Sequence, residues 1–219
     1  MGFIERLRSS GSMLALGIEV MELPSNYVLD RESIKLNAYR LICHFYANKE
    51  ISRHTDPDTR DDAIAILEDN YFFREISKLL LEVAISVRVL DDQMKTLEKN
   101  SEIRTSYEKS MANVNRHHQC MMFNEMNFRE VCNKIIHANV VEPHLEETKD
   151  GSHEIDNYNW LGWSEAMEHS EGENISKPDP IKWEHLTNNV RLGGQHRGKQ
   201  WWYLLEVPTF VGAIGVLLE

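Results

Sequence analysis

The chain has 219 residues, of which 42% are hydrophobic and 27% are charged. These values exclude an intrinsically disordered chain and are typical of a folded protein, so we expect one domain over residues 1–219 around a single core. The apolar stretches are too short, or too often interrupted by charges, for a membrane span.

The net charge of −11 is unevenly distributed. Residues 142–184 contain twelve acidic residues and three lysines, which leaves −9 in this segment and −2 elsewhere. We interpret about 142–184 as an acidic insertion in the domain. Because a global anion repels nucleic acid at long range, any RNA binding requires a local basic surface.

Cysteine usage and the first residues predict a cytoplasmic protein. The three cysteines are an odd number without C-x-x-C spacing, which favours reduced thiols. Cys43 and Cys132 lie in apolar patterns and are interpreted as buried hydrophobes. The apolar run in Met1–Val20 ends at Glu19, too early for a signal peptide, so we expect this segment to be part of the fold.

Two helices are predicted near the start. Apolar residues at helical spacing predict a helix from Asp30 to about Lys49, followed by a loop over Ile51–Pro57. Asp56-Pro57-Asp58 is typical of a helix start and predicts a short helix that ends at about Leu67.

The strongest periodic signal predicts a long amphipathic helix. Its apolar residues alternate in steps of four and three over three heptads: Ile76, Leu80, Val83, Val87, Leu90, Met94 and Leu97. Such a seam suits either the interior of a helical bundle or pairing between subunits, and we favour the interior.

A further helix is predicted from about Asn124 to Val141, ended by Pro143, while the polar segment 101–119 leaves helix and connection open. At 100° per residue, one broad face of this helix is apolar: Phe128, Val131, Cys132, Ile135, Ile136 and Ala138.

Loops, strands and a last helix are predicted in the remaining chain. Residues 151–182 have loop composition, although Trp160 and Trp163 indicate that part of the segment packs. Leu186–Leu192 and Gln200–Leu205 are predicted strands joined by a glycine-rich turn over 193–198, and Val207-Pro208-Thr209 begins a helix to Leu218. The fold class is therefore mainly α: a helical bundle with a loop-rich acidic insertion and a small C-terminal β-hairpin with its helix at about 186–219.

Arg129, Asn133 and His137 form the candidate catalytic ridge, because each lies four residues from the next along the predicted helix. Histidine exchanges protons near pH 7, and arginine stabilises charge on a phosphate. Asparagine can orient the imidazole or bind a base or phosphate. The alternative is a polar flank that hydrogen-bonds to a neighbouring helix.

The segment Phe128–Ala138, with Arg129, Asn133 and His137, resembles the signature helix of the HEPN superfamily, helical proteins of prokaryotic defence and toxin systems. The resemblance implies a helical bundle, commonly a homodimer, whose Arg and His together cleave RNA without metal. It implies that His137 is the family histidine and Asn133 its polar companion.

The arginine departs from the family pattern, which places four to six residues between Arg and His. Seven residues separate Arg129 from His137. Either Arg129 reaches the site from one helical step further back, or the chain has lost cleavage. The second possibility predicts a non-catalytic dimerisation or interaction module that binds a protein or nucleic-acid partner.

The predicted hairpin combines cations with aromatic residues, a mixture that can hold a phosphate backbone and stack bases. We therefore list its candidate RNA-binding residues: Arg191, His196, Arg197, Lys199 and Trp201. The alternative is that the aromatic rings pack on the bundle and the cations are only solvated.

No metal or cofactor is expected. The histidines near the acidic segment are scattered, and the chain lacks a phosphate-binding glycine loop, a G-x-S-x-G motif and an H-E-x-x-H motif. These absences argue against nucleotide hydrolase, esterase and zinc-protease functions.

Overall fold

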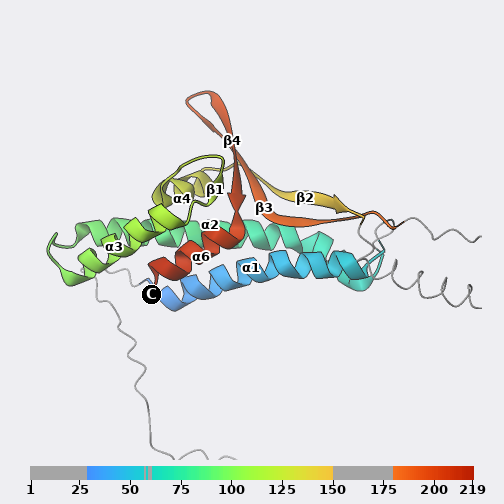
Figure 1. Cartoon of the computed structure of the whole chain (residues 1–219), viewed down its shortest axis with the longest axis horizontal. Helices are drawn as coiled ribbons and strands as arrows, with labels where there is room; N and C mark the ends of the chain where they lie inside the picture. Colours follow the sequence, from blue (N-terminus) through green and yellow to red (C-terminus); the bar gives the residue numbers. More distant parts are fainter. Residues whose placement is uncertain (1–28, 57, 59–60, 150–179) are drawn as a thin grey trace, which may run out of the picture.

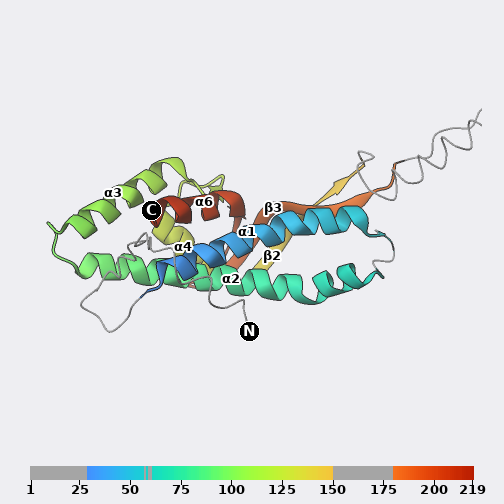
Figure 2. The same cartoon turned by 90° about the horizontal axis from the view of Figure 1, so that it is seen from below.

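The computed structural model describes residues 29–56, 58, 61–149 and 180–219, and these contain five helices and four strands. Two long helices, α1 (Arg31–His54) and α2 (Ala63–Thr96), lie side by side and form one layer (Figures 1 and 2). The mainly α class is confirmed. None of the described helices is long and apolar enough to cross a membrane.

Helix α1 begins after Asp30, whose side chain caps it by accepting a hydrogen bond from the backbone N–H of Glu32 at 3.0 Å. The predicted end at Lys49 and the predicted loop at residues 51–54 were wrong, because the helix continues to His54. Buried Asn48 accepts a hydrogen bond from the N–H of Leu186 and donates one to Glu68, so tertiary partners stabilise the polar turns at this end.

Helix α2 is one continuous element, so the prediction of a separate short helix ending at Leu67 was wrong. It starts at Ala63 because the Asp62 carboxylate accepts from the N–H groups of Ile64 and Ala65. No glycine or proline interrupts residues 68–75. The predicted seam lies in the chain's own core: Ile76, Leu80, Val83, Val87, Leu90 and Met94 are each at most 2% exposed.

Residues 101–119, left open by the sequence, are largely helical. Helix α3 (Glu102–His117) is capped by Ser101 and buries only Tyr107 and Val114. A helix that buries only two side chains needs little apolar periodicity, and this explains why the sequence did not indicate α3.

Helix α4 (Phe128–Ile136) is shorter than predicted. The expectation that it continues to Val141 and ends at Pro143 was wrong, because strand β2 begins at Val140 and contains Pro143. Val140 pairs with Gly193, and the N–H of Asn139 donates to the Gly193 carbonyl at 2.9 Å. Pairing with an existing strand thus overrides the helical pattern of this segment.

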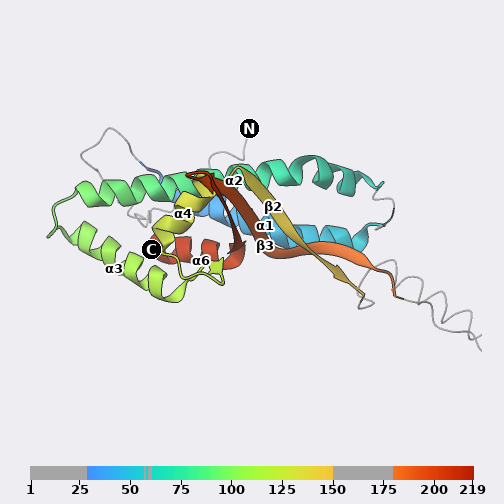
Figure 3. The same ribbon diagram turned by 90° about the horizontal axis from the view of Figure 1, so that it is seen from above.

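An antiparallel sheet packs over the helical layer (Figure 3). Its strands are β1 (Met121–Met122), β2 (Val140–Thr148), β3 (Trp183–His196) and β4 (Lys199–Glu206), in the order β1-β4-β3-β2. The predicted acidic insertion therefore begins and ends in strands. Its middle, with the predicted loop and the packing of Trp160 and Trp163, lies outside the described residues.

Both predicted C-terminal strands lie within longer strands of this sheet. The predicted glycine-rich turn is shorter in the structure, because β3 continues to His196 and only Arg197 and Gly198 connect it to β4. Both have positive φ, 49° and 77°, as a type I′ turn requires. The end of this pair of strands projects away from the helical layer (Figure 1).

The last element, α6 (Val207–Leu217), follows β4 directly and packs beside α1 and α3. Phe210 of α6 contacts Phe128 of α4 with ring centroids 5.5 Å apart. This contact anchors the short helix α4, which carries the candidate site, to the common core.

Candidate functional site

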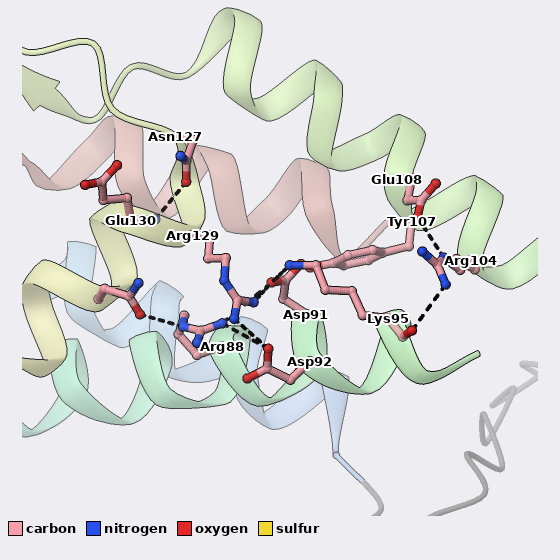
Figure 4. A network of polar contacts seen from close by, with 11 residues as sticks. Arg88, Asp91, Asp92, Lys95, Arg104, Tyr107, Glu108, Asn127, Arg129 and Glu130 are labelled. Atoms are coloured by element: carbon pink, nitrogen blue, oxygen red, sulfur yellow. Dashed lines mark hydrogen bonds and ion pairs between the residues drawn. The ribbon is translucent and has the colours of Figure 1, made fainter. Parts of the chain in front are cut away.

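Two members of the predicted ridge are engaged with α2 (Figure 4). The guanidinium of Arg129 forms an ion pair with Asp91 and donates to Asp92 Oδ1 at 2.7 Å. The side-chain carbonyl of Asn133 accepts from Arg88 Nε at 2.6 Å. The flank of α4 therefore hydrogen-bonds to a neighbouring helix, as the alternative interpretation of the ridge expected.

Asp91 is the centre of this network and is only 4% exposed. Besides the contact with Arg129, its carboxylate accepts hydrogen bonds from Lys95 Nζ at 2.7 Å and from the hydroxyl of Tyr107 at 3.2 Å. Arg88 Nη1 lies 3.6 Å from the same carboxylate. Burying a carboxylate destabilises the folded state unless opposite charges and hydrogen bonds compensate for its lost hydration. Here three cations and a phenol hydroxyl do so.

Burial and charge also act on the ionisable groups around Asp91. Burial raises the pKa of Tyr107 well above its ordinary value, so its hydroxyl remains a hydrogen-bond donor. Partial burial, together with the neighbouring Arg88 cation, lowers the pKa of Arg129. Arginine still stays protonated at neutral pH, and its positive charge is balanced by Asp91 and Asp92.

The network borders a pocket of about 420 Å³ between α2, α3 and α4. Its lining includes the cations Arg129 and Lys95 and the apolar side chains of Met94 and Met111. His137 is not among the lining residues.

His137 lies beyond the end of α4, where it is the C-cap and its backbone N–H donates to the Asn133 carbonyl at 3.0 Å. Its side chain is exposed, and within the described residues its imidazole has no hydrogen-bond or ion-pair partner. His137 lies eight positions after Arg129, with seven residues between them, which corresponds to a rise of about 12 Å at helical spacing. Arg129 is thus engaged with α2, whereas His137 lies about two turns further along, at the C-terminal end of α4.

The strands β3 and β4 present the other predicted site residues. Cross-strand partners point to the same face of a sheet, so His196 with Lys199 and Gly194 with Trp201 lie on one face. Arg191 lies on the opposite face, where its guanidinium stacks on Trp202 at 4.1 Å and reaches Glu142 at 3.6 Å. Arg197 occupies the turn between the strands, and residues 195–200 are all exposed.

The face with Trp201 is also bordered by α4. Lys134 Nζ lies 4.8 Å from the ring centroid of Trp201 and 5.0 Å from that of Tyr203, distances typical of cation–π contacts. We call this surface the basic face: Lys134, His196, Arg197, Lys199 and Trp201. It joins the exposed tip of the strand pair to the last turn of α4, beside His137.

Two glycines allow the indole rings to lie across the sheet. A Cβ at Gly194 would approach Trp201 to 2.2 Å, and one at Gly193 would approach Trp202 to 2.3 Å. The glycine-rich segment is therefore strand backbone covered by aromatic rings, whereas the sequence pattern indicated a turn.

The residues of this site that the sequence interpretation missed are mainly on α2. Arg88, Asp91 and Asp92 hold the α4 flank, yet only one signal indicated them: Asp91 lies beside Leu90 and three residues before Met94, a charge within the apolar seam. Such a charge requires a buried partner, but its identity follows only from the packing of α4 on α2.

No group of three or more His, Cys, Asp or Glu side chains in the described part of the chain is arranged to hold a metal ion. Comparison of the chain with protein-family models, with curated proteins and with solved structures finds no significant match.

Proposed function

We propose that this chain is a non-catalytic binding module and that its basic face binds single-stranded RNA. The observation that supports this best is that the cations of the two predicted sites differ in their carboxylate partners. Arg129 is balanced by two aspartates, whereas Arg197 and Lys199 are exposed on a projecting tip and, among the described residues, lack a carboxylate partner.

The chemistry of the basic face fits an RNA strand. Lys134, Arg197 and Lys199 provide three cations for phosphates, and Lys134 lies over the half-buried rings of Trp201 and Tyr203. Glu142 pairs with the cation of the opposite face, so that face is the weaker candidate.

The overall charge limits the expected affinity. The net charge of −11 repels an approaching RNA until salt screens it beyond the Debye length, so the attraction must come from short-range contacts with the basic face. Three phosphate contacts with a single strand predict that log K falls against log salt with a slope of about −2.

Binding is tested by fluorescence anisotropy with a labelled single-stranded RNA and the full chain. Arg197→Glu and Lys199→Glu are expected to weaken binding at least about tenfold each, because each replaces a phosphate contact by a repelling charge. Lys109→Glu is the matched control, a cation that is also exposed, on α3, and it should leave affinity nearly unchanged.

Arg191→Gln is a second control, because it removes a cation from the opposite face of the same strands. Equal losses in Lys109→Glu and Arg197→Glu would mean that only net charge matters and would overturn the proposal. So would preferential binding of an acidic peptide over RNA by the same surface.

Metal-independent RNA cleavage is a second candidate, in keeping with the HEPN resemblance. It is favoured by the exposed imidazole of His137, one turn beyond Lys134 at the edge of the basic face. RNA incubated with the chain and a chelator should then yield products with a cyclic phosphate, and His137→Ala should abolish them. Intact RNA at high protein concentration would contradict cleavage and leave the binding proposal unaffected.

A further inference from the structure

The pocket between α2, α3 and α4 combines apolar and polar walls. Met94 and Met111 give it apolar surface, and Lys95 and Arg129 bring cations to it. Its volume of about 420 Å³ is in the range of small-molecule sites, which pair apolar walls with a few well-placed polar groups. We call it the interhelix pocket.

The two carboxylates that line the interhelix pocket already have cationic partners. Asp91 is paired with Lys95 and Arg129, and Glu108 accepts a hydrogen bond from Arg104 Nε at 2.7 Å. A positively charged ligand would have to compete with these partners for the same oxygens. The pocket is therefore poorly suited to a cation.

The pocket is also lined by two asparagine amides, Asn115 and Asn127. The side-chain oxygen of Asn115 accepts from the N–H of Phe128 at 2.7 Å, and that of Asn127 accepts from the N–H of Glu130 at 2.9 Å. Because a backbone N–H can only donate, these contacts identify the oxygen of each amide. Within the described part of the chain, neither of the two NH₂ groups makes a hydrogen bond.

Both cations retain hydrogen-bond donors as well. A guanidinium carries five N–H donors and an ammonium three. Arg129 contacts Asp91 and Asp92 through one nitrogen each, and Lys95 contacts Asp91 (Figure 4). The side chains of Arg129 and Lys95 are 33% and 52% exposed, so their remaining N–H groups are accessible. The unused hydrogen-bonding capacity of the lining thus consists mainly of donors.

We propose that the interhelix pocket is a binding site for a small organic carboxylate with an apolar body. The carboxylate oxygens accept hydrogen bonds from Arg129 and from the NH₂ groups of Asn115 and Asn127. A planar guanidinium matches the geometry of a carboxylate. The apolar body packs against Met94 and Met111, whose flexible thioether chains adapt to irregular apolar groups.

The surrounding charge favours a carboxylate over a phosphate. Asp91, Asp92 and the net charge of −11 repel any anion, and this repulsion grows with the charge of the ligand. A phosphate monoester carries about −1.5 to −2 at pH 7, whereas a carboxylate carries a single negative charge. The interhelix pocket thus differs in ligand from the basic face, and the inference does not rest on RNA binding.

Binding is tested by nuclear magnetic resonance titration of the full chain with phenylacetate, for which we expect a dissociation constant of roughly 1 mM or lower. Acetate lacks the apolar body and should bind at least about tenfold more weakly. Phenyl phosphate should also bind more weakly than phenylacetate, because of its higher charge. Benzylamine carries the opposite charge and should not bind.

Asn127→Asp tests the polar end of the pocket. Aspartate caps a helix as well as asparagine does, so α4 keeps its N-cap while the NH₂ donor is replaced by an oxygen that repels a carboxylate. Phenylacetate binding should weaken at least about tenfold. Asn113→Asp is the matched control, because it makes the same change at an exposed residue of α3 that does not line the pocket. Far-ultraviolet circular dichroism checks that both variants keep the fold.

Met111→Gln tests the apolar wall. Glutamine is similar in length and helix propensity, so the variant should weaken phenylacetate binding and leave acetate binding nearly unchanged. Absence of phenylacetate binding, or tighter binding of phenyl phosphate or benzylamine, overturns the proposal. Equal losses in Asn127→Asp and Asn113→Asp also overturn it. Because these variants lie outside the basic face, RNA affinity measured in parallel separates this result from the proposed function.

Discussion

Asp91 of α2 and Arg129 of α4 form an ion pair between the helix that carries the core seam and the helix that carries the HEPN-like motif. The pair explains why a charge stands within the apolar seam of α2. It also balances the guanidinium that the motif would assign to catalysis. The relationship between these two side chains therefore bears on both the stability of the chain and its proposed function.

Breaking this ion pair is expected to destabilise the fold. Asp91→Ala leaves Arg129, Arg88 and Lys95 without their shared carboxylate, and because these cations keep partial access to water we expect a loss of about 1–3 kcal/mol. Urea denaturation should show a lower free energy of unfolding with an unchanged m-value.

The double variant with Arg129→Met separates the pair from its surroundings. If the ion pair dominates, the double variant should be less destabilised than the sum of the two single variants. Simple additivity would show that Asp91 acts mainly through Tyr107 or Lys95.

Gly194→Ala is expected to disturb the basic face. The added Cβ would meet the Trp201 ring at 2.2 Å, so the indole must move away from the strand and from Lys134. We expect a loss of about 1–3 kcal/mol, as for other overpacked sites.

The matched control is Gly215→Ala in α6, where nothing lies within 4 Å of the added Cβ. Alanine is the better helix former, so this variant should be neutral or slightly more stable. Thermal unfolding measures both variants, and tryptophan fluorescence should change only in Gly194→Ala.

The three thiols should differ in reactivity. Burial raises the pKa of Cys120 to about 12 and that of Cys132 further, and both side chains are fully buried. Since the thiolate is the reactive form, alkylation of the native chain should label only Cys43, which is half-buried. Mass spectrometry would show one label in the native chain and three after denaturation; rapid labelling of Cys120 would contradict the packing of this region.

Stability should decrease at alkaline pH. In the unfolded chain the Cys120 thiol loses its proton near its ordinary pKa of 9.0, whereas in the folded chain the pKa is about 12. Above pH 9 the unfolded state binds fewer protons, so this contribution is complete below pH 9 and is lost up to about pH 12. Each such group adds a slope of at most about 1.4 kcal/mol per pH unit. Cys120→Ala should flatten the pH dependence of the unfolding free energy, and an unchanged slope would argue against this assignment.

The long-range periodicity of α2 was readable from the sequence. Three heptads of apolar residues specify one buried stripe whatever the partner, because an amphipathic helix must bury its apolar face. The same periodicity did not reveal that residues 63–75 belong to this helix, since exposed apolar residues such as Ile64 and Leu67 there resemble a separate short element. The helix is continuous because its buried positions continue through Phe72 and Ala65.

The candidate site was predictable only in part. The spacing of Arg129 and Asn133 correctly placed both side chains on one flank of α4. Whether that flank faces solvent, substrate or another helix depends on Arg88, Asp91 and Asp92, which lie some forty residues earlier in the chain. Local spacing carries no information on such partners.

The sequence by itself determined the mainly α class, the buried seam of α2 and the last helix, because these depend on periodic apolar residues that act through their own helix. Only the tertiary structure decided the ends of α1 and α4, the four-stranded sheet and the pairing of Arg129 with Asp91. Those features depend on which backbone segment or charged side chain from a distant part of the sequence packs against a given residue. A segment such as Val140–Val141 can continue a helix or pair with Leu192 and Gly193, and the neighbouring strand decides between the two.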